Sequence, residues 1–187
     1  MSAFVLREAV LSDVPRLAQI YGHAVLNGTA SFELMPPSEA EMQVRFETLK
    51  AQGYPYIVAA DRKGRVLGYA YAGPFRLRPA YRWSVEDSIY ICPDAYGRGA
   101  GGALLQRLLE LCEEKGFRQM IAVIGGSDHA PSIRLHESAG FRTIGIFTGS
   151  GFKFGRWIDT VFMQMPIGDG RLSLPDETAG PGLLFGS

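Results

Sequence analysis

A glycine-rich segment, Tyr96-Gly97-Arg98-Gly99-Ala100-Gly101-Gly102, places the strongest limit on what this chain can fold into. It stands between an apolar, β-prone stretch and a helical pattern, and four of the six residues from 97 to 102 are glycine. Residues without side chains let backbone amides converge on an anion at the positive end of a helix. A flexible turn with a helix cap is the simpler interpretation, but a cap needs fewer glycines. The segment therefore predicts a strand–turn–helix unit that binds a pyrophosphate.

The same glycines also fit a dinucleotide-binding fingerprint, because Gly97, Gly99 and Gly102 have its spacing. In that fold the glycine loop directly follows the first strand, whereas here several predicted strands precede it and residues 93–96 intervene. The next predicted strand ends at Gly125 without a carboxylate for ribose. A nicotinamide cofactor is therefore the minor alternative.

The remaining patterns predict an α/β fold with a mixed, mostly antiparallel sheet flanked by helices. Strands are expected at 4–8, 56–60, 66–72, 85–92, 119–124, 142–147 and 158–165. Helices are expected from a cap at Ser12 to about residue 25, from the Ser38–Glu41 capping box to about residue 50, from the glycine turn to Gly116, and over 131–139. The polar turn at 61–65 predicts a hairpin, so the sheet should begin antiparallel.

Length and composition favour one domain, since 187 residues with 47% hydrophobic content can bury one substantial core. We expect this domain to span residues 1–167. Residues 168–187 turn to Gly, Pro, Ser and Asp with little periodicity, which indicates a C-terminal arm or a disordered tail.

The charge balance argues against nucleic acid and anionic membranes as partners. Lys and Arg together number 19, as do Asp and Glu, so the chain has no net charge to attract polyanions. No segment has the ~20 apolar residues of a membrane span, and the N-terminus lacks a signal pattern, so we expect a cytoplasmic protein. Cys92 and Cys112 have no metal-ligand spacing, which predicts reduced thiols and no metal, with Cys112 in the core.

Five motifs together carry a family resemblance. They are residues 68–74 (GYAYAGP), 85–91 (VEDSIYI), the glycine turn, 132–141 (SIRLHESAGF) and 151–157 (GFKFGRW). With them the sequence resembles the GNAT superfamily of N-acetyltransferases, and within it the phosphinothricin and methionine sulfoximine or methionine sulfone acetyltransferase branch. The resemblance covers nearly all of residues 4–165. It implies the GNAT fold, acetyl-CoA as acetyl donor, and the amine of a small amino-acid-like acceptor.

The resemblance also implies which residues hold acetyl-CoA. The backbone of Ile89, Tyr90 and Ile91 would pair with the pantetheine arm, and residues 97–102 would hold the pyrophosphate. His129 and Ser132 are further expected contacts. The superfamily usually has Gln or Arg where this chain has Tyr96, and Asn where it has His129. Tyr96 should be tolerated because the turn binds through amides. The imidazole of His129 has its donor and acceptor on separate ring nitrogens, so it does not reproduce the geometry of an amide and one CoA contact stays open.

The candidate catalytic base is Glu86. An amine is mostly protonated at pH 7, so attack on a thioester needs a nearby proton acceptor. On an alternating strand Glu86, Ser88 and Tyr90 share one face, beside the thioester if the neighbouring backbone holds pantetheine. A simple ion pair with an arginine is the alternative. The resembling family assigns its base to the matching glutamate, and direct attack would proceed without an acyl-enzyme.

Two residues are candidates for protonating the departing CoA thiolate. His136 stands where the superfamily often has tyrosine, and it could donate that proton, assist deprotonation, or be an ordinary packed histidine. Tyr90 is the other candidate, and its alternative role is a stacked core aromatic.

The segment 75–83 is expected to bind the acceptor. It holds Arg76, Leu77, Arg78, Tyr81 and Arg82, and guanidinium groups suit carboxylate or phosphinate oxygens. A solvated basic loop is the alternative. Phe32 matches a family position that lines the acceptor pocket, although a core position would also suit it. The predicted acceptor-binding set is completed by Ser84, Val85, Glu86 and Ser88. Residues 152–157 resemble the part that borders the site near a dimer partner, which implies a homodimer.

Two rival functions remain open. A non-catalytic acyl-CoA-binding sensor would keep the glycine turn but transfer no acetyl group. A GNAT enzyme acting on protein N-termini or polyamines is the other alternative, although polyamines would prefer acidic pockets and segment 75–83 is rich in arginine.

Overall fold

The computed structural model describes residues 4–178 and 181, and it is built on one seven-stranded sheet in the order β1-β2-β3-β4-β5-β7-β6. The strands are β1 (Val5–Glu8), β2 (Tyr56–Ala60), β3 (Val66–Pro74), β4 (Ser84–Ile91), β5 (Gln119–Gly125), β6 (Arg142–Lys153) and β7 (Arg156–Pro166). Every neighbouring pair is antiparallel except β4 and β5. The predicted mixed, mostly antiparallel sheet is thus confirmed.

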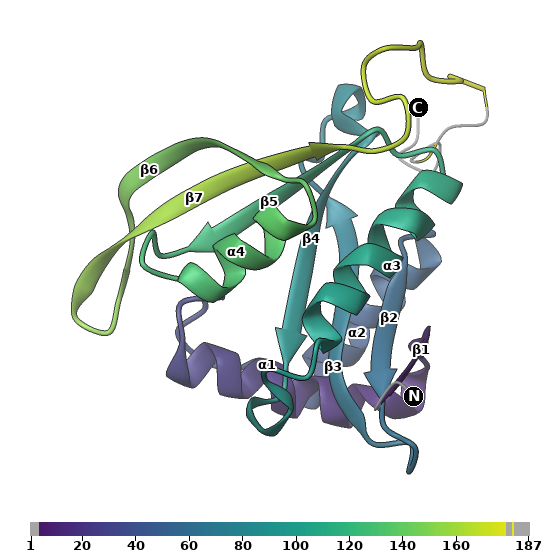
Figure 1. Ribbon diagram of the computed structural model, residues 1–187. Helices are drawn as coiled ribbons and strands as arrows, with labels where there is room; N and C mark the ends of the chain where they lie inside the picture. The colour runs from purple at the N-terminus through teal and green to yellow at the C-terminus, as the bar shows by residue number, and fades with distance from the viewer. Residues whose placement is uncertain (1–3, 179–180, 182–187) are drawn as a thin grey trace.

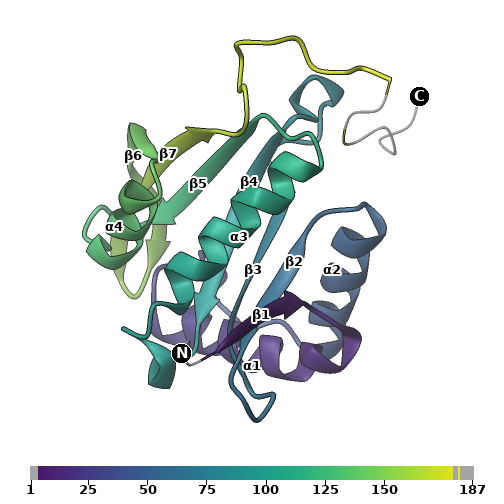
Figure 2. The same cartoon turned by 45° about the vertical axis from the view of Figure 1, so that its right-hand side comes forward.

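Helices cover both faces of this sheet (Figures 1 and 2). They are α1 (Val14–Asn27), α2 (Glu39–Ala51), α3 (Ala100–Glu114) and α4 (Ala130–Ser138). Buried side chains of α1 and α2 form one core against the sheet, and those of α3 form a second core on the opposite face. The second core includes Cys112, as predicted, and both cysteines are buried, free thiols.

The two predicted helix caps had different outcomes. The Ser38–Glu41 capping box is confirmed, because Ser38 Oγ accepts from Glu41 N at 3.2 Å and Glu41 Oε2 accepts from Ser38 N at 2.7 Å. The predicted Ser12 cap is wrong. A 3₁₀ turn over Leu11–Asp13 precedes α1, and Asp13 accepts a hydrogen bond from Val10 N while its carboxylate pairs with Arg7.

The β6–β7 hairpin is longer than predicted and projects beyond the rest of the sheet (Figure 1). Its tip uses Phe154 and Gly155, both with positive φ, so the chain reverses within two residues. Register shifts between Thr143 and Gly145 and between Phe147 and Gly151 interrupt the pairing. These irregularities hid the second half of β6 from period-based prediction.

After β7 the chain contributes one core residue, Ile167, and then continues to Thr178 without helix or strand. Arg118 Nη2 donates to the Leu174 carbonyl oxygen at 3.3 Å, which fastens part of this segment to the domain. Residues 179–180 and 182–187 of the predicted arm lie outside the described residues. Within the described part of the chain, no helix has both the length and the apolar character that a membrane span requires.

Candidate active site

The site begins where strands β4 and β5 separate. β4 pairs with β3 from Val85 to Ile91, but with parallel β5 only from Ser84 to Glu86. Beyond Glu86 a cavity of about 600 Å³ opens between the strands, lined on one side by the residues from Glu86 to Ile91 and on the other by those from Ala122 to Gly125. Along this stretch the β5-facing edge of β4 is left without a strand partner, so it can pair with an extended ligand.

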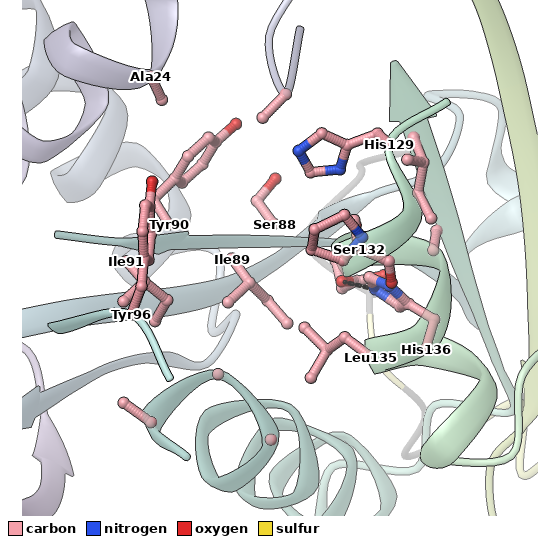
Figure 3. A pocket seen from close by; sticks show the side chains of 18 of the residues that line it. Ala24, Ser88, Ile89, Tyr90, Ile91, Tyr96, His129, Ser132, Leu135 and His136 are labelled. Carbon is pink, nitrogen blue, oxygen red and sulfur yellow. Dashed lines mark hydrogen bonds and ion pairs between the residues drawn. The ribbon is translucent and has the colours of Figure 1, made fainter. Parts of the chain in front are cut away.

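The strand alternation of β4 divides its cavity residues between two faces. Figure 3 shows Ser88, Tyr90 and His129 on one side of the strand, and Ile89, Leu135 and His136 on the other. Glu86 shares the Ser88 face by its even spacing. The cavity therefore reaches both faces of the sheet, with Glu86 on one face and Ile89, Leu135 and His136 on the other, which continues to α3.

The glycine turn closes one end of the cavity. Gly97, Gly99, Ala100, Gly101 and Gly102 all contribute to its lining. Gly99 has φ 80° and is the N-cap of α3, so the chain enters the helix through a left-handed residue. The first amides of an α-helix have no intrahelical partner, and the helix dipole places positive charge there. This end of the cavity is suited to an anion.

Arg98 belongs to the glycine turn but lies outside the cavity lining. Its side chain is exposed, and Nη2 donates to the Asp94 carbonyl oxygen at 2.6 Å. This hydrogen bond stabilises the segment between β4 and α3.

Glu86 is partly buried at the point where the strands diverge. Burial raises the pKa of Glu86, the charge of Asp87 raises it further, and the charge of Arg76 offsets part of the increase, giving a value of about 7. The carboxylate is therefore present in both protonation states near neutral pH, which suits a group that accepts a proton.

On the other face of β4, Asp87 and His136 form a buried pair. Asp87 Oδ2 lies 3.0 Å from His136 Nε2, and His136 Nδ1 lies 2.8 Å from the Ser132 carbonyl oxygen. Burial alone would lower the pKa of His136, but the hydrogen bond and charge of Asp87, aided by the Ser132 carbonyl, bring it above its ordinary value. The Ser132 carbonyl oxygen can only accept, so His136 Nδ1 carries a proton and donates to it, and the raised pKa favours the imidazolium form, in which Nε2 donates to Asp87.

Tyrosines pack beside the cavity on the Glu86 face. The Tyr21 and Tyr90 rings meet edge to face with centroids 4.9 Å apart, and Tyr69 lies 5.3 Å from Tyr90. Burial raises the pKa of Tyr90 well above its ordinary value, so its hydroxyl keeps its proton throughout the physiological range.

His129 stands at the start of α4 and lines the cavity with Ser132. Its Nδ1 is buried and has no hydrogen-bond partner among the described residues. Burial lowers the pKa of His129, although Asp128 offsets part of the effect. A neutral imidazole with an unsatisfied buried nitrogen is prepared to bond a ligand.

The cavity brings together many of the residues predicted from the sequence. They are Glu86, Ser88, Ile89, Tyr90, Ile91, Gly97, Gly99, Ala100, Gly101, Gly102, His129, Ser132 and His136.

Other residues predicted from the sequence lie outside the cavity lining. In the segment between β3 and β4, Arg76, Leu77, Arg78 and Tyr81 are exposed, and Tyr81 belongs to a 3₁₀ turn over Pro79–Tyr81. The Arg82 guanidinium lies 3.9 Å from the centroid of the Trp83 ring.

Three more predicted acceptor residues also lie outside the lining. Ser84 begins β4, and the Val85 side chain is fully buried in the core. Phe32 lies between Gly125 and Gly151 in the link that follows α1.

Some lining residues were not predicted. Asp87 is the most consequential, and a charged residue at an apolar-face position of a buried strand was the available signal. Ala24 and Ala30 come from α1 and the following link, and small side chains there gave no pattern to detect. Among the described residues, no group of three or more His, Cys, Asp or Glu side chains is placed to hold a metal ion.

The open strand edge, the anion-binding helix start and the carboxylate that ionises near neutral pH are together typical of an acetyltransferase. The model of the acetyltransferase (GNAT) family matches residues 23–141, more than half of the chain. The chain therefore belongs to the GNAT family, and its fold and class are those implied by the sequence motifs.

Several relatives are similar over most of their length. The phosphinothricin N-acetyltransferase of Alcaligenes faecalis is 49% identical over 164 residues, covering 88% of this chain and 83% of the relative. The L-methionine sulfoximine/L-methionine sulfone acetyltransferase of Pseudomonas aeruginosa is 42% identical, covering 89% and 96%. A phosphinothricin acetyltransferase from Sinorhizobium meliloti, crystallised in complex with AcCoA, has a TM-score of 0.95 at 52% identity and covers 99% of this chain and 100% of that one.

Proposed function

We propose that this enzyme transfers the acetyl group of acetyl-CoA to the α-amine of a small amino-acid-like acceptor such as phosphinothricin, methionine sulfoximine or methionine sulfone. The observation that carries the proposal is one continuous cavity that joins the anion-binding turn to Glu86 along an unpaired strand edge. The relatives named for these acceptors support the choice of substrate class.

The cavity has groups that fit each part of acetyl-CoA. The amides of the glycine turn would hold the pyrophosphate, and the free edge of β4 at residues 89–91 would pair with the amides of the pantetheine arm. The buried Nδ1 of His129 and the nearby Ser132 offer further polar contacts.

Glu86 acts as the general base in this mechanism. It accepts a proton from the acceptor's ammonium group, directly or through a water molecule. The nitrogen lone pair then attacks the thioester carbonyl carbon, and the C–S bond breaks as the tetrahedral intermediate collapses. The nitrogen loses its second proton in this step, and that proton balances the one that the departing thiolate takes up. A base with a pKa of about 7 is better matched to an amine than an ordinary carboxylate.

The departing thiolate requires a proton or a compensating charge. In its imidazolium form His136 supplies positive charge, but both of its N–H groups are then engaged by Asp87 and Ser132. The Tyr90 hydroxyl lies on the Glu86 face and keeps its proton, so we assign Tyr90 as the proton donor. Comparing kcat for Tyr90→Phe and His136→Gln tests this assignment. Tyr90→Phe should lower kcat more, because it removes the group that protonates the leaving thiolate.

The arginines of segment 75–83 would bind the acceptor's acidic groups. Arg76 is close enough to Glu86 for its charge to lower the pKa of that carboxylate. Its guanidinium lies 4.6 Å from the centroid of the Phe75 ring, and Arg82 has a buried Nε without a partner among the described residues. A polyamine has no anionic group for these side chains, which favours an amino-acid-like acceptor.

We propose further that the protein is a homodimer and that it is located in the cytoplasm. The β6–β7 hairpin exposes a set of large apolar side chains, which are Ile144, Ile146, Phe147, Phe152, Phe154 and Trp157. Trp157 is 69% exposed, and a cluster of this kind is typical of an interaction surface. Two free, buried thiols suit a reducing compartment. Sedimentation of the purified protein tests the dimer, and cell fractionation tests the location.

Initial rates over a grid of acetyl-CoA and methionine sulfone concentrations test the central reaction. Direct attack within a ternary complex gives double-reciprocal lines that intersect, whereas an acyl-enzyme gives parallel lines. Release of free thiol without acetylated product, or binding of acetyl-CoA without any turnover, would instead support a hydrolase or an acyl-CoA sensor.

A further inference from the structure

The link between α1 and α2 forms part of the cavity wall without any regular structure of its own. Residues 28–33, which we call the 28–33 link, are neither helix nor strand, yet Ala30 lines the cavity. In Figure 1 the link leaves the end of α1 on the side of the molecule where α4 and the β6–β7 hairpin lie. Its path must therefore be fixed by contacts with other elements.

Lys153, the last residue of β6, anchors the link. The residue is only 4% exposed, and Nζ donates to the Gly28 carbonyl oxygen at 2.9 Å and to the Ser31 carbonyl oxygen at 2.7 Å. A buried ammonium needs such partners, and here one ammonium joins two carbonyls that lie three residues apart. Burial lowers the pKa of Lys153, and the charge of Glu33 offsets part of that effect.

Two glycines leave a notch for the aromatic ring of the link. A Cβ atom added to Gly151 of β6 would lie 2.4–2.8 Å from three carbons of the Phe32 ring. One added to Gly125 of β5 would lie 2.0 Å from the Thr29 carbonyl oxygen and 2.8 Å from the same ring. Contacts this short are not tolerated, so the Phe32 ring depends on both glycines.

The link is also fastened to α1 and β5. Thr29 Oγ1 donates to the Gly125 carbonyl oxygen at 2.5 Å. Tyr21 and Ser31 share a hydrogen bond of 2.9 Å between their hydroxyl oxygens, and the Tyr21 ring contacts Tyr90 of the cavity. The wall is thus held from three elements, on the side of β4 that carries Glu86.

We propose that Lys153 and Gly151 are positioning residues for the acceptor, which fix the 28–33 link as a rigid wall of its half of the cavity. This inference rests on the proposed function. Neither residue lines the cavity, and both act on the link rather than on the glycine turn, so they should influence acceptor binding without influencing acetyl-CoA binding.

Lys153→Met tests the anchor because it keeps the length and apolar stem of the side chain but removes the donors. We expect the KM for methionine sulfone to rise about 10-fold or more, because a small displacement of a positioned wall is costly. The Kd of acetyl-CoA, measured by calorimetry, should change less than about 2-fold, because Lys153 acts on the link and not on the glycine turn. Lys50→Met is the matched control, since Lys50 pairs with Glu8 away from this cavity.

Gly151→Ala tests the notch by a double-mutant cycle. In the wild-type background the added methyl group should displace the Phe32 ring and raise the acceptor KM. In a Phe32→Ala background the same substitution should have little further effect, because no ring remains to be displaced. Equal effects in the two backgrounds would overturn the role of Gly151.

An unchanged acceptor KM in Lys153→Met, or equal losses of acceptor and acetyl-CoA binding, would overturn the role of Lys153. Hydrogen exchange measures the anchor without any acceptor, so it distinguishes a failure of this inference from a failure of the proposed function. If the wild type acetylates no amino-acid-like acceptor, the proposed function is wrong and the acceptor role falls with it. Faster exchange of residues 28–33 in Lys153→Met would then support the anchor alone, and unchanged exchange would overturn that as well.

Discussion

Asp87 Oδ2 lies 3.0 Å from His136 Nε2, and this buried pair occupies the face of β4 opposite to the one that carries Glu86. The alternation of one strand thus places two neighbouring carboxyl groups in different environments. Asp87 is paired with His136, whereas Glu86 is desolvated without such a partner and has a raised pKa. One strand thereby carries, at neighbouring positions, a carboxylate paired with a histidine and a carboxylate with a raised pKa.

Replacing Asp87 with Asn should lower the pKa of His136. Without the carboxylate, burial dominates and the ring should lose its Nε2 proton near neutral pH. The raised pKa stabilises the fold below pH ~6.5, and that contribution is lost as pH rises through the folded value. Asp87→Asn should therefore cost about 2 kcal/mol or more at pH 6 and less at pH 9. NMR titration and urea unfolding measure both quantities, and an unmoved His136 titration would refute the pairing.

Glu86→Gln should lower kcat by about 100-fold or more, as loss of a general base often does. In the wild type, kcat/KM should rise with pH through about 7 as Glu86 ionises. That rise should be missing from the variant, whose remaining pH dependence reflects the acceptor amine alone. Acetyl-CoA affinity is the control and should be unchanged. A variant with near-normal turnover between pH 7 and 9 would remove Glu86 from the mechanism.

The same substitution should stabilise the protein at alkaline pH. The pKa of Glu86 is about 7 in the fold against a reference value of 4.5, so the unfolded chain releases its proton first as pH rises. Wild-type stability should fall across that window by up to about 3 kcal/mol relative to Glu86→Gln, and the two proteins should be similar at pH 4. Urea unfolding at pH 4 and pH 8 provides the comparison. Equal differences at the two pH values would mean that Glu86 is not desolvated.

Gly101→Ala should separate stability from donor binding. Its Cβ would make ordinary contacts with Leu135 and Ile91, at 3.6 and 3.8 Å, so the fold accepts it and the helix gains about 0.5 kcal/mol. Because Gly101 lines the cavity, the Kd of acetyl-CoA should rise about 10-fold or more through lost access to the helix amides. Gln106→Ala, on the exposed side of α3, is the control. Unchanged calorimetric affinity for Gly101→Ala would place the donor elsewhere.

The sequence predicted most of the sheet and helix order because apolar periodicity, capping and turn residues are local signals. The Ser38–Glu41 capping box and the hairpin of β2 and β3 are of this kind. The Ser12 cap failed because Asp13, one residue later, binds both Val10 N and Arg7, a competition that the pattern alone does not resolve. The full length of β6 was missed because its register shifts disturb the period of two.

The residues of the candidate site also divide into those that local motifs predict and those that they do not. Glu86 and the glycine turn stand in local motifs, so their roles could be proposed from the sequence. The Asp87–His136 pair joins positions 49 residues apart, and Lys153 reaches carbonyl groups more than 120 residues earlier in the chain. Which residues meet in such contacts depends on tertiary packing and cannot be derived from one sequence, although its charge at an apolar-face position marked Asp87 itself.

The acceptor comparison tests the central claim most directly. Thiol release from acetyl-CoA is measured for phosphinothricin, methionine sulfoximine, methionine sulfone, methionine and a polyamine, with wild type and Arg78→Ala. A second oxidised or anionic group should accept a hydrogen bond from an arginine of segment 75–83. Where acceptor binding buries that donor, a thioether that leaves it unpaired loses about 1 to 3 kcal/mol. We expect kcat/KM for the oxidised analogues to exceed that for methionine by about 5-fold to 150-fold, and Arg78→Ala to reduce this preference. Equal efficiency for methionine and its oxidised analogues, or a clear preference for the polyamine, would contradict the acceptor assignment.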